Sequence, residues 1–196
     1  KSLSKIRSSI STLNAMFDAL LNISKLDADA MSINQRVFRL EELATTLRDL
    51  FETKAANKGL TFTLTHPHLS VRGDKLLLQQ ILSNLFSNAI QYTERGGIEV
   101  QLAAKNDCLC MAVRDTGCGI ATAEQPHIFH QFYRADKTRS LHDGLGLGLS
   151  IVQRLCVLIG ADIQVQSQEG QGATFTVNTP FALAADEDDL PNLPRN

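Results

Sequence analysis

The sequence predicts an α/β fold that follows one long helix. Three observations support this prediction. Apolar residues near the start repeat at heptad spacing, helix and strand patterns interleave from residue 31 to about residue 180, and two of the strand patterns flank a short polar turn. The chain has 196 residues, of which 43% are hydrophobic, so it can bury a core and is sized between one domain and two.

The first 30 residues are predicted to form a long coiled-coil helix. Its apolar seam advances in steps of three and four residues through Leu3, Ile6, Ile10, Leu13, Phe17 and Leu20. A helix lying on its own domain is the alternative, but that helix would show a wider stripe with a period nearer 3.6 residues. The narrow seam therefore favours a helical bundle, and the polar stretch 25–29 separates it from the rest of the chain.

Helices and strands alternate in the predicted order of the remaining elements. A strand over residues 33–38 precedes a helix over 40–58 that ends at Gly59, then a strand over 60–65. Asp74 is predicted to cap a strongly apolar helix that runs through Ala89. Residues 98–104 and 108–113 form a predicted hairpin around 105–107.

A long irregular stretch, residues 117–145, comes next and is expected to be functional or mobile. A helix over 146–158, a strand over 163–167, a turn at 170–172 and a strand over 174–179 complete the domain, which is predicted to span residues 31–182. Residues 183–196 contain an acidic run and two prolines, and they are predicted to be a linker or a terminus.

Composition excludes several classes of function. The net charge of −2 and the absence of a Lys/Arg cluster argue against a nucleic-acid partner. The longest apolar run, residues 155–161, is too short to span a bilayer and no secretory leader is present, so we expect a cytoplasmic segment without membrane contact, although its parent could be membrane-anchored. The cysteines, Cys108, Cys110, Cys118 and Cys156, lack zinc-type spacing and are expected to be free thiols.

Glycine alternates with leucine in residues 143–151, where an apolar helical pattern begins. Backbone N–H groups can approach a ligand closely at glycines, and the first turn of a helix offers unpaired donors and a positive dipole end. A phosphate site is one interpretation of Gly144, Gly146 and Gly148, and an ordinary turn is the other.

Two further features could contact a ligand. Asn84 and Asn88 are four residues apart on one helical face among apolar neighbours, and their amide oxygens could hold Mg²⁺ beside phosphates. Asp115, followed by Gly117 and Gly119, comes at the end of a strand, where a carboxylate could accept a hydrogen bond from an exocyclic amine. The alternatives are surface asparagines and an aspartic protease, but the protease half-site needs an almost all-β chain.

Other nucleotide motifs are excluded. The chain has neither a P-loop nor the protein-kinase signatures, and the spacing of Gly144, Gly146 and Gly148 does not fit the dinucleotide fingerprint.

Taken together, these segments resemble the catalytic ATP-binding domain of sensor histidine kinases, within the wider family of gyrase, heat-shock-chaperone and mismatch-repair ATPases. The resemblance covers residues 1 to about 181. It comprises an asparagine box at 84–93, a first glycine box at 115–120, a phenylalanine box at 128–134, a second glycine box at 144–149 and a closing glycine-threonine turn at 170–175. It implies an α+β two-layer sandwich, with a mixed, mostly antiparallel sheet of about five strands covered on one face by three helices.

The resemblance also implies ATP and Mg²⁺ as ligands. Asn84 and Asn88 would act in catalysis by holding Mg²⁺ and phosphate, Tyr92 would pack near the adenine and Asp115 would accept from its amine. Thr174 would support the adenine pocket through water, and Phe129, Phe132 and Arg134 would anchor the lid. The ATP-binding set is completed by Gln91, Gly117, Gly119, Ile120, Gly144, Leu145, Gly146, Leu147 and Gly148.

By the same resemblance, residues 1–30 would be the second helix of a dimerisation and phosphotransfer hairpin, giving a homodimer in the parent protein. The γ-phosphoryl group would pass to a histidine on the other helix of the hairpin and then to an aspartate of a response-regulator receiver domain. None of the histidines, His66, His68, His127, His130 and His142, has the sequence context of a phosphoacceptor.

Two departures from the family pattern keep alternatives open. Gln91 stands where many kinases have a lysine or arginine, and Leu145 replaces a small or hydroxylated residue. An inactive kinase-like module is therefore one alternative. A hydrolysing ATPase is another, but those relatives use a glutamate at the position of Asn84 to activate water, and an amide cannot act as that base.

Overall fold

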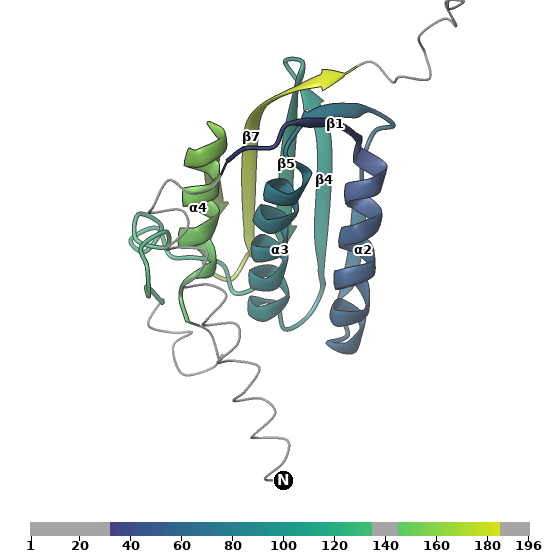
Figure 1. Ribbon diagram of the computed structural model, residues 1–196. Helices are drawn as coiled ribbons and strands as arrows, with labels where there is room; N and C mark the ends of the chain where they lie inside the picture. Colours follow the sequence, from purple (N-terminus) through teal and green to yellow (C-terminus); the bar gives the residue numbers. More distant parts are fainter. Residues whose placement is uncertain (1–31, 135–144, 185–196) are drawn as a thin grey trace, which may run out of the picture.

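The computed structural model describes residues 32–134 and 145–184, which form two layers (Figure 1). Helices α2 (Leu40–Asn57), α3 (Lys75–Tyr92) and α4 (Gly148–Ile159) lie side by side on one face of a sheet. This arrangement confirms the predicted sandwich with helices on one face. The predicted N-terminal coiled-coil helix and the acidic run of the tail lie outside the described residues.

The described strands number seven, where about five were expected. They are β1 (Arg36–Arg39), β2 (Thr61–Thr65), β3 (Ser70–Gly73), β4 (Gly97–Lys105), β5 (Cys108–Asp115), β6 (Asp162–Ser167) and β7 (Ala173–Ala184). Their order in the sheet is β1-β3-β7-β5-β4-β2. Outside this order, β6 pairs with residues 173–178 of β7, the part of that strand that precedes its pairing with β3. Only the β2–β4 pair among them is parallel, so the sheet is mixed and mostly antiparallel.

β3 is the strand that the sequence analysis did not predict. It pairs with β1 over four residues, from Arg36↔Gly73 to Arg39↔Ser70. A four-residue strand has too few positions for an alternating pattern, which explains why β3 escaped prediction. β7 also continues past the predicted strand and past the predicted domain end at residue 182, because Val71 pairs with Leu183 and Ser70 with Ala184.

Local signals fix the ends of the helices. The Asp74 carboxylate accepts hydrogen bonds from the N–H groups of Leu76 and Leu77, which confirms the predicted cap of α3. Gly160 has a left-handed conformation, with a φ of 71°, and ends α4. α4 starts at Gly148, two residues later than predicted, because Gly146 has a φ of +68° that a helix cannot contain.

The core lies between the helices and the sheet. Phe86 of α3 is fully buried and its ring meets Phe51 of α2 edge-on, with centroids 5.2 Å apart. Buried side chains of the same layer come from all three helices and from β4 and β5: Leu43, Leu47, Leu78, Leu82, Val100, Met111, Val152 and Leu155. This packing holds α3 and α4 against the ends of β5 and β7.

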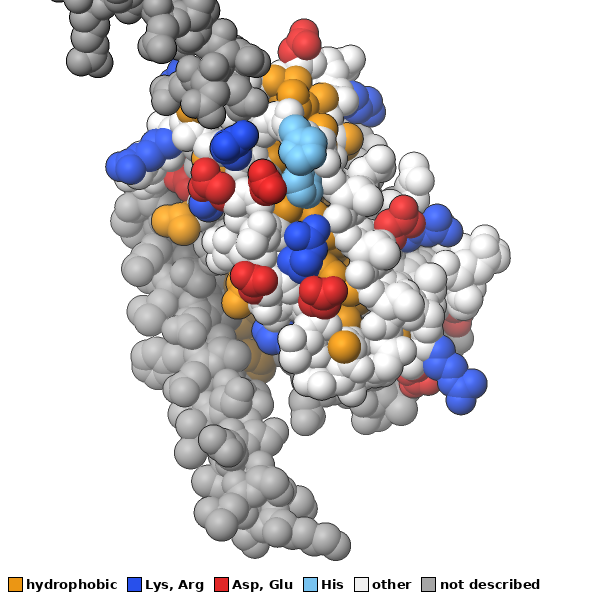
Figure 2. All heavy atoms as spheres, turned by 90° about the vertical axis from the view of Figure 1, so that its right-hand side faces the viewer, with side chains coloured by type: hydrophobic (Ala, Val, Ile, Leu, Met, Phe, Trp, Pro, Cys, Tyr) orange, Lys and Arg blue, Asp and Glu red, His pale blue; other side chains and the backbone are white. Residues whose placement is uncertain are grey.

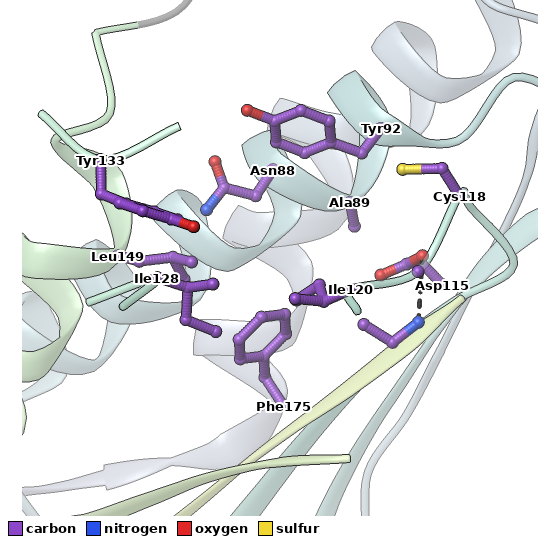
Figure 3. A pocket seen from close by; sticks show the side chains of 12 residues that line it. Asn88, Ala89, Tyr92, Asp115, Cys118, Ile120, Ile128, Tyr133, Leu149 and Phe175 are labelled. Atoms are coloured by element: carbon purple, nitrogen blue, oxygen red, sulfur yellow. Dashed lines mark hydrogen bonds between the residues drawn. The ribbon is translucent and has the colours of Figure 1, made fainter. Parts of the chain in front are cut away.

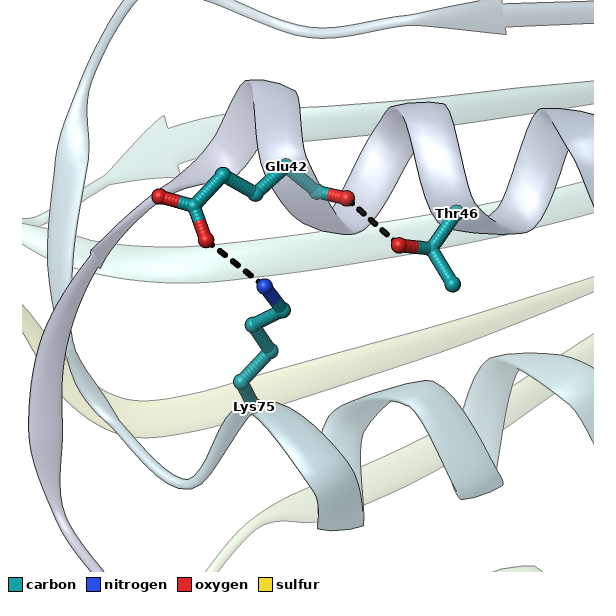
Figure 4. Close-up of polar contacts among 3 residues, drawn as sticks. All are labelled: Glu42, Thr46 and Lys75. Carbon is teal, nitrogen blue, oxygen red and sulfur yellow. Dashed lines mark hydrogen bonds and ion pairs between the residues drawn. The ribbon is translucent and has the colours of Figure 1, made fainter.

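Polar contacts connect the helices at the surface. The Lys75 ammonium at the start of α3 donates to the Glu42 carboxylate of α2 at 2.6 Å (Figure 4). At the other end of the same helix pair, the Lys58 ammonium donates to the carbonyls of Ile90 and Gln91. Acidic and basic side chains are interspersed over the side of the molecule that Figure 2 shows. No helix in residues 32–134 and 145–184 is long and apolar enough to cross a membrane.

Candidate nucleotide-binding site

Two hollows adjoin between α3, α4 and the ends of β5 and β7. The first is a cavity of about 90 Å³ whose wall is mostly apolar (Figure 3). The second, of about 220 Å³, lies toward the N-terminus of α4. Both are lined by Asn88, Tyr92, Ile128 and Leu149, so they form one continuous site with two chemically different ends.

Asp115 is the charged group of the first hollow and the last residue of β5. Its Oδ1 accepts hydrogen bonds from the Gly117 N–H at 2.8 Å and from the Ala173 N–H at 3.3 Å, the second of which is drawn in Figure 3. Its Oδ2 accepts no hydrogen bond from any described residue. Asp115 is only 8% exposed, and burial raises the pKa of its carboxyl group while the two N–H donors partly offset the rise.

This end of the site is suited to a flat apolar ligand that carries an N–H group. Phe175, Ile120 and Ile128 supply apolar walls and Tyr92 supplies an aromatic ring. The Oδ2 of Asp115, to which no described residue donates, can accept a hydrogen bond from a donor inside the hollow.

The turn after β5 is held tightly on both sides. The Cys118 N–H donates to the Tyr92 carbonyl at the end of α3, and the Cys118 carbonyl accepts from the Gly170 N–H in the β6–β7 turn. At Gly119 the φ is +66°, and a Cβ would lie 2.0 Å from the Gln168 carbonyl oxygen. Only glycine fits there, which explains in part why this strand end carries the Asp-Thr-Gly-Cys-Gly sequence.

Asn84 and Asn88 mark the second hollow. Their side-chain oxygens both lie 3.4 Å from the point where a Cβ on Gly148 would be. The Nδ2 of Asn84 donates to the Gln80 carbonyl, so its hydrogen-bond donor is engaged within α3 and its oxygen is left as the free acceptor. The two amides therefore face the first residue of α4.

The N-terminus of α4 completes this end. Its N-cap residue, Leu147, gives no side-chain cap to the helix. The first N–H groups of a helix have no partner within the helix and carry the positive end of its dipole. With carboxamide oxygens on one side and helix N–H groups on the other, this hollow can accept an anion together with a cation.

The glycine before α4 sets the position of this helix end. Gly146 has a φ of +68°, and a Cβ on it would lie 2.6 Å from the Tyr133 carbonyl oxygen. The Gly146 carbonyl accepts a hydrogen bond from the Phe132 N–H. The segment before α4 is thereby fastened to the segment around residue 133, which also lines the first hollow.

Most residues of the predicted site are brought together. The hollows are lined by Asn84, Asn88, Gln91, Tyr92, Asp115, Gly119, Ile120, Leu145, Gly146, Leu147 and Gly148. Gly144 lies outside the described residues.

Five residues assigned to the site by the resemblance do not line either hollow, and one of them, Phe129, packs against the core instead. Gly117 contributes its N–H to Asp115 instead, and Phe132 is 61% exposed. The positive charge of Arg134 partly offsets the rise in the pKa of Tyr92 that burial causes. Thr174 lies on the opposite face of β7 from Ala173 and Phe175, which line the first hollow.

Several lining residues fall within the predicted boxes but were given no role of their own in the sequence analysis: Ala89, Cys118, Ile128, Tyr133, Leu149, Ala173 and Phe175. A signal for two of them was present. In β7, buried Ala173, Phe175 and Val177 alternate with less buried polar residues, and this period of two places Thr174 away from the helices. Ile128 and Tyr133 lie within the irregular stretch, where no periodicity predicts which way a side chain points.

The chain resembles known proteins over most of its length. The profile of the family described as histidine kinase-, DNA gyrase B-, and HSP90-like ATPase matches residues 73–183. The sensor histidine kinase AtsR of Burkholderia thailandensis is 34% identical over 98% of this chain, and the signal transduction histidine-protein kinase BarA of Escherichia coli is 36% identical over 88%. The chain spans 34% of the length of AtsR and 20% of BarA.

Solved structures show the same likeness. Full-length ShkA in complex with AMPPNP superimposes with a TM-score of 0.83 at 31% identity, over 93% of this chain and 38% of ShkA. The catalytic domain of the histidine kinase ThkA gives a TM-score of 0.65 at 27% identity, over 75% of this chain and 95% of ThkA. The fold, the two-ended site and these matches agree, and the chain belongs to the histidine kinase-, DNA gyrase B- and HSP90-like ATPase family.

Proposed function

We propose that this chain binds ATP with its adenine at the Asp115 end and its phosphates at the α4 end, as the catalytic part of a sensor histidine kinase. The observation that carries the proposal is the continuity of the two hollows through Asn88. One end is apolar with a buried acceptor and the other is polar beside a helix N-terminus, which matches the two halves of a nucleotide.

At the adenine end, Oδ2 of Asp115 would accept from the exocyclic amine. Tyr92 and Ile120 would pack against the ring. Because Ala173 and not Thr174 lines this hollow, we assign Thr174 no direct contact with the base.

At the phosphate end, the N–H groups of Gly148 and its neighbours would bind phosphate oxygens. The free amide oxygens of Asn84 and Asn88 are hard, neutral ligands of the kind that Mg²⁺ accepts when phosphates supply the charge, so the residues present fit this ion. When bound, Mg²⁺ would neutralise charge on the phosphates.

The proposed reaction transfers the γ-phosphoryl group from ATP to an imidazole nitrogen of a histidine. The bond to the β-phosphate oxygen breaks, a phosphorus–nitrogen bond forms, and ADP leaves. The residues of this chain contribute by positioning the nucleotide and excluding water. Asn84 argues against direct hydrolysis, because its Nδ2 donates to Gln80 and neither amide atom can remove a proton from water.

We propose that the phosphoacceptor histidine comes from outside these 196 residues. The rings of His127 and His130 are 5.4 Å apart beside the first hollow, and neither has the sequence context of an acceptor. Residues 1–30 would form a helix of the dimerisation hairpin, residues 31–184 the ATP-binding domain, which includes all of β7, and residues 185–196 a linker. A homodimer and a response-regulator receiver domain are the proposed partners, and the cytoplasmic location stays a prediction.

Calorimetry with ATP and Mg²⁺ tests the nucleotide site. Wild type should release heat that depends on Mg²⁺, and Asn88→Ala should lose this dependence with a decrease in affinity of about tenfold or more, because a metal ligand is removed. An inactive module without nucleotide binding would give no heat in either protein.

Labelling with γ-³²P-ATP tests the transfer. The chain should not label itself, and it should label a separate hairpin that carries the acceptor histidine. Stoichiometric self-labelling would show that one of the histidines of this chain is an acceptor. Steady release of phosphate without any acceptor would instead support a hydrolysing ATPase.

A further inference from the structure

The thiol of Cys118 lies on the wall of the first hollow. Figure 3 shows its sulfur between the side chains of Tyr92 and Asp115. The backbone of Cys118 is fixed from both sides, since its N–H donates to the Tyr92 carbonyl at 3.3 Å and its carbonyl accepts from the Gly170 N–H at 2.7 Å. The residue is exposed, so a reagent can reach the thiol without unfolding the domain.

A second feature of the same hollow indicates a ligand there. Asp115 is 92% buried, since it is 8% exposed, and its Oδ2 has no donor among the residues that the structure describes. A ring that satisfies this oxygen would lie against the Cys118 sulfur. This step rests on the proposed nucleotide function of the site.

We propose that Cys118 is a modification site for soft electrophiles of the α,β-unsaturated carbonyl class, and that the adduct and a nucleotide exclude one another. In the addition, the sulfur forms a bond to the β-carbon, the carbon–carbon π bond opens, and the thiol proton ends on the α-carbon. Nothing leaves and no oxidant is consumed. Cys118 lines the hollow together with Asp115 and Tyr92, so a ring attached to its sulfur would overlap the space of the proposed adenine.

The other cysteines serve as internal references. Cys156 is 1% exposed, and burial raises the pKa of its thiol to about 12. Cys108 and Cys110 are half-buried on β5 and do not line the hollow. Partial burial also raises the pKa of Cys118, with Asp115, Glu94 and Glu124 adding negative charge, so the reaction is run at mildly alkaline pH to populate the thiolate.

The test uses the 196-residue chain and N-ethylmaleimide, with and without AMPPNP and Mg²⁺. Peptide mass spectrometry follows the modification of each cysteine. We expect Cys118 to react first, and AMPPNP at ten times its Kd to slow that reaction about tenfold, because only the free chain exposes the thiol. The rate at Cys108 should not respond to AMPPNP.

The modified chain is then purified, its far-UV circular dichroism is compared with that of the unmodified chain, and AMPPNP is titrated. We expect an unchanged spectrum and an affinity lowered by about tenfold or more. For Cys118→Ser, the AMPPNP affinity is measured before and after treatment with N-ethylmaleimide, and the two values should be the same. Cys108→Ser should be inactivated like the wild type.

The outcomes separate this inference from the proposed function. If AMPPNP binds but does not protect Cys118, or if the modified chain binds AMPPNP as before, the inference is wrong and the nucleotide function stands. Inactivation of Cys118→Ser by the reagent would also overturn it, because another group would then be responsible. A chain that binds no AMPPNP before treatment would overturn the proposed function and this inference together.

Discussion

Asp115 meets two opposing demands at the end of β5. Its carboxylate is buried, which disfavours the charged form, yet the proposed contact with an adenine amine needs an acceptor at Oδ2. The N–H groups of Gly117 and Ala173 compensate only Oδ1. The residue is therefore placed for binding at some expense of stability.

Asp115→Asn is expected to weaken nucleotide binding while it keeps the hydrogen bonds within the protein. The amide keeps one oxygen for the two N–H donors but presents an NH₂ group to the ligand amine. Loss of a hydrogen bond to a charged acceptor costs about 1.5–3 kcal/mol, so the Kd for AMPPNP should rise about 10- to 100-fold. Calorimetry measures this change, and an unaltered Kd would remove Asp115 from the adenine site.

The stability of the wild type, relative to this variant, should depend on pH in a defined direction. The folded pKa of Asp115 is raised above its ordinary value of 3.8, so the folded chain keeps a proton that the unfolded chain has already released. The contribution of Asp115 to the free energy of unfolding is thus greatest below this ordinary value and falls as the pH rises through the folded pKa.

Thermal unfolding at a series of pH values tests this. The melting temperature of Asp115→Asn, relative to wild type, should increase as the pH rises from about 4 toward neutrality, because the variant has no carboxylate to ionise. A difference that stays constant over this range would show that ionisation of Asp115 does not affect folding.

At the scale of elements, the turn after β5 depends on a glycine. Gly119 and Gly170 both have positive φ, but a Cβ on Gly119 would strike the Gln168 carbonyl, whereas Gly170 has open space around it. Gly170→Ala should therefore lower the free energy of unfolding by about 1–2 kcal/mol, from the backbone conformation alone.

Gly119→Ala adds a backbone clash to the same conformational cost. Its loss of stability should exceed that of Gly170→Ala by more than about 1 kcal/mol, because the turn must shift away from the β6–β7 connection. Urea unfolding measures both variants. Equal losses would mean that the turn relaxes freely and that the packing around Gly119 is not tight.

The ion pair between α2 and α3 should matter much less. Lys75 and Glu42 are 33% and 51% exposed, and the pKa of Glu42 is lowered mainly by its hydrogen bond to Lys75. Exposed ion pairs contribute up to about 1 kcal/mol, so Lys75→Met should lower the free energy of unfolding by less than this amount. In 1 M salt, where the screening length is about 3 Å, the two proteins should have the same free energy of unfolding. If Lys75→Met loses more than about 1 kcal/mol and salt does not change that loss, the lysine stem contributes by packing.

Local chemistry made some elements predictable. The Asp74 cap of α3 and the hairpin between β4 and β5 depend on residues within a few positions of one another, and both were predicted correctly. β3 and the end of β7 depend on pairing with distant strands, which no local pattern encodes. Likewise, the sequence motifs identified the boxes of the site. Which side chains of the box at 128–134 reach the hollow, as Ile128 and Tyr133 do, depends on the path of an irregular segment.

For the whole molecule, the proposed ligand should stabilise the fold by mass action. A nucleotide that binds only the folded chain adds about 2.7 kcal/mol to the free energy of unfolding at 100 times its Kd. AMPPNP with Mg²⁺ should accordingly raise the melting temperature, and EDTA should reduce the increase. The Asp115→Asn variant at the same AMPPNP concentration is the control. Because it should bind the nucleotide more weakly, its melting temperature should rise less.

The face of the sheet opposite the described helices offers a site for attaching a fluorescent label. Gln164 and Gln166 of β6 are exposed, and they pair with the half-buried Thr176 and Thr174 of β7. A fluorophore attached at Gln164 would sit on the rigid scaffold, with the sheet between it and the ligand. A second dye on the helical side would then report movement around the nucleotide as a change in energy transfer, measured from a reference point that the ligand does not touch.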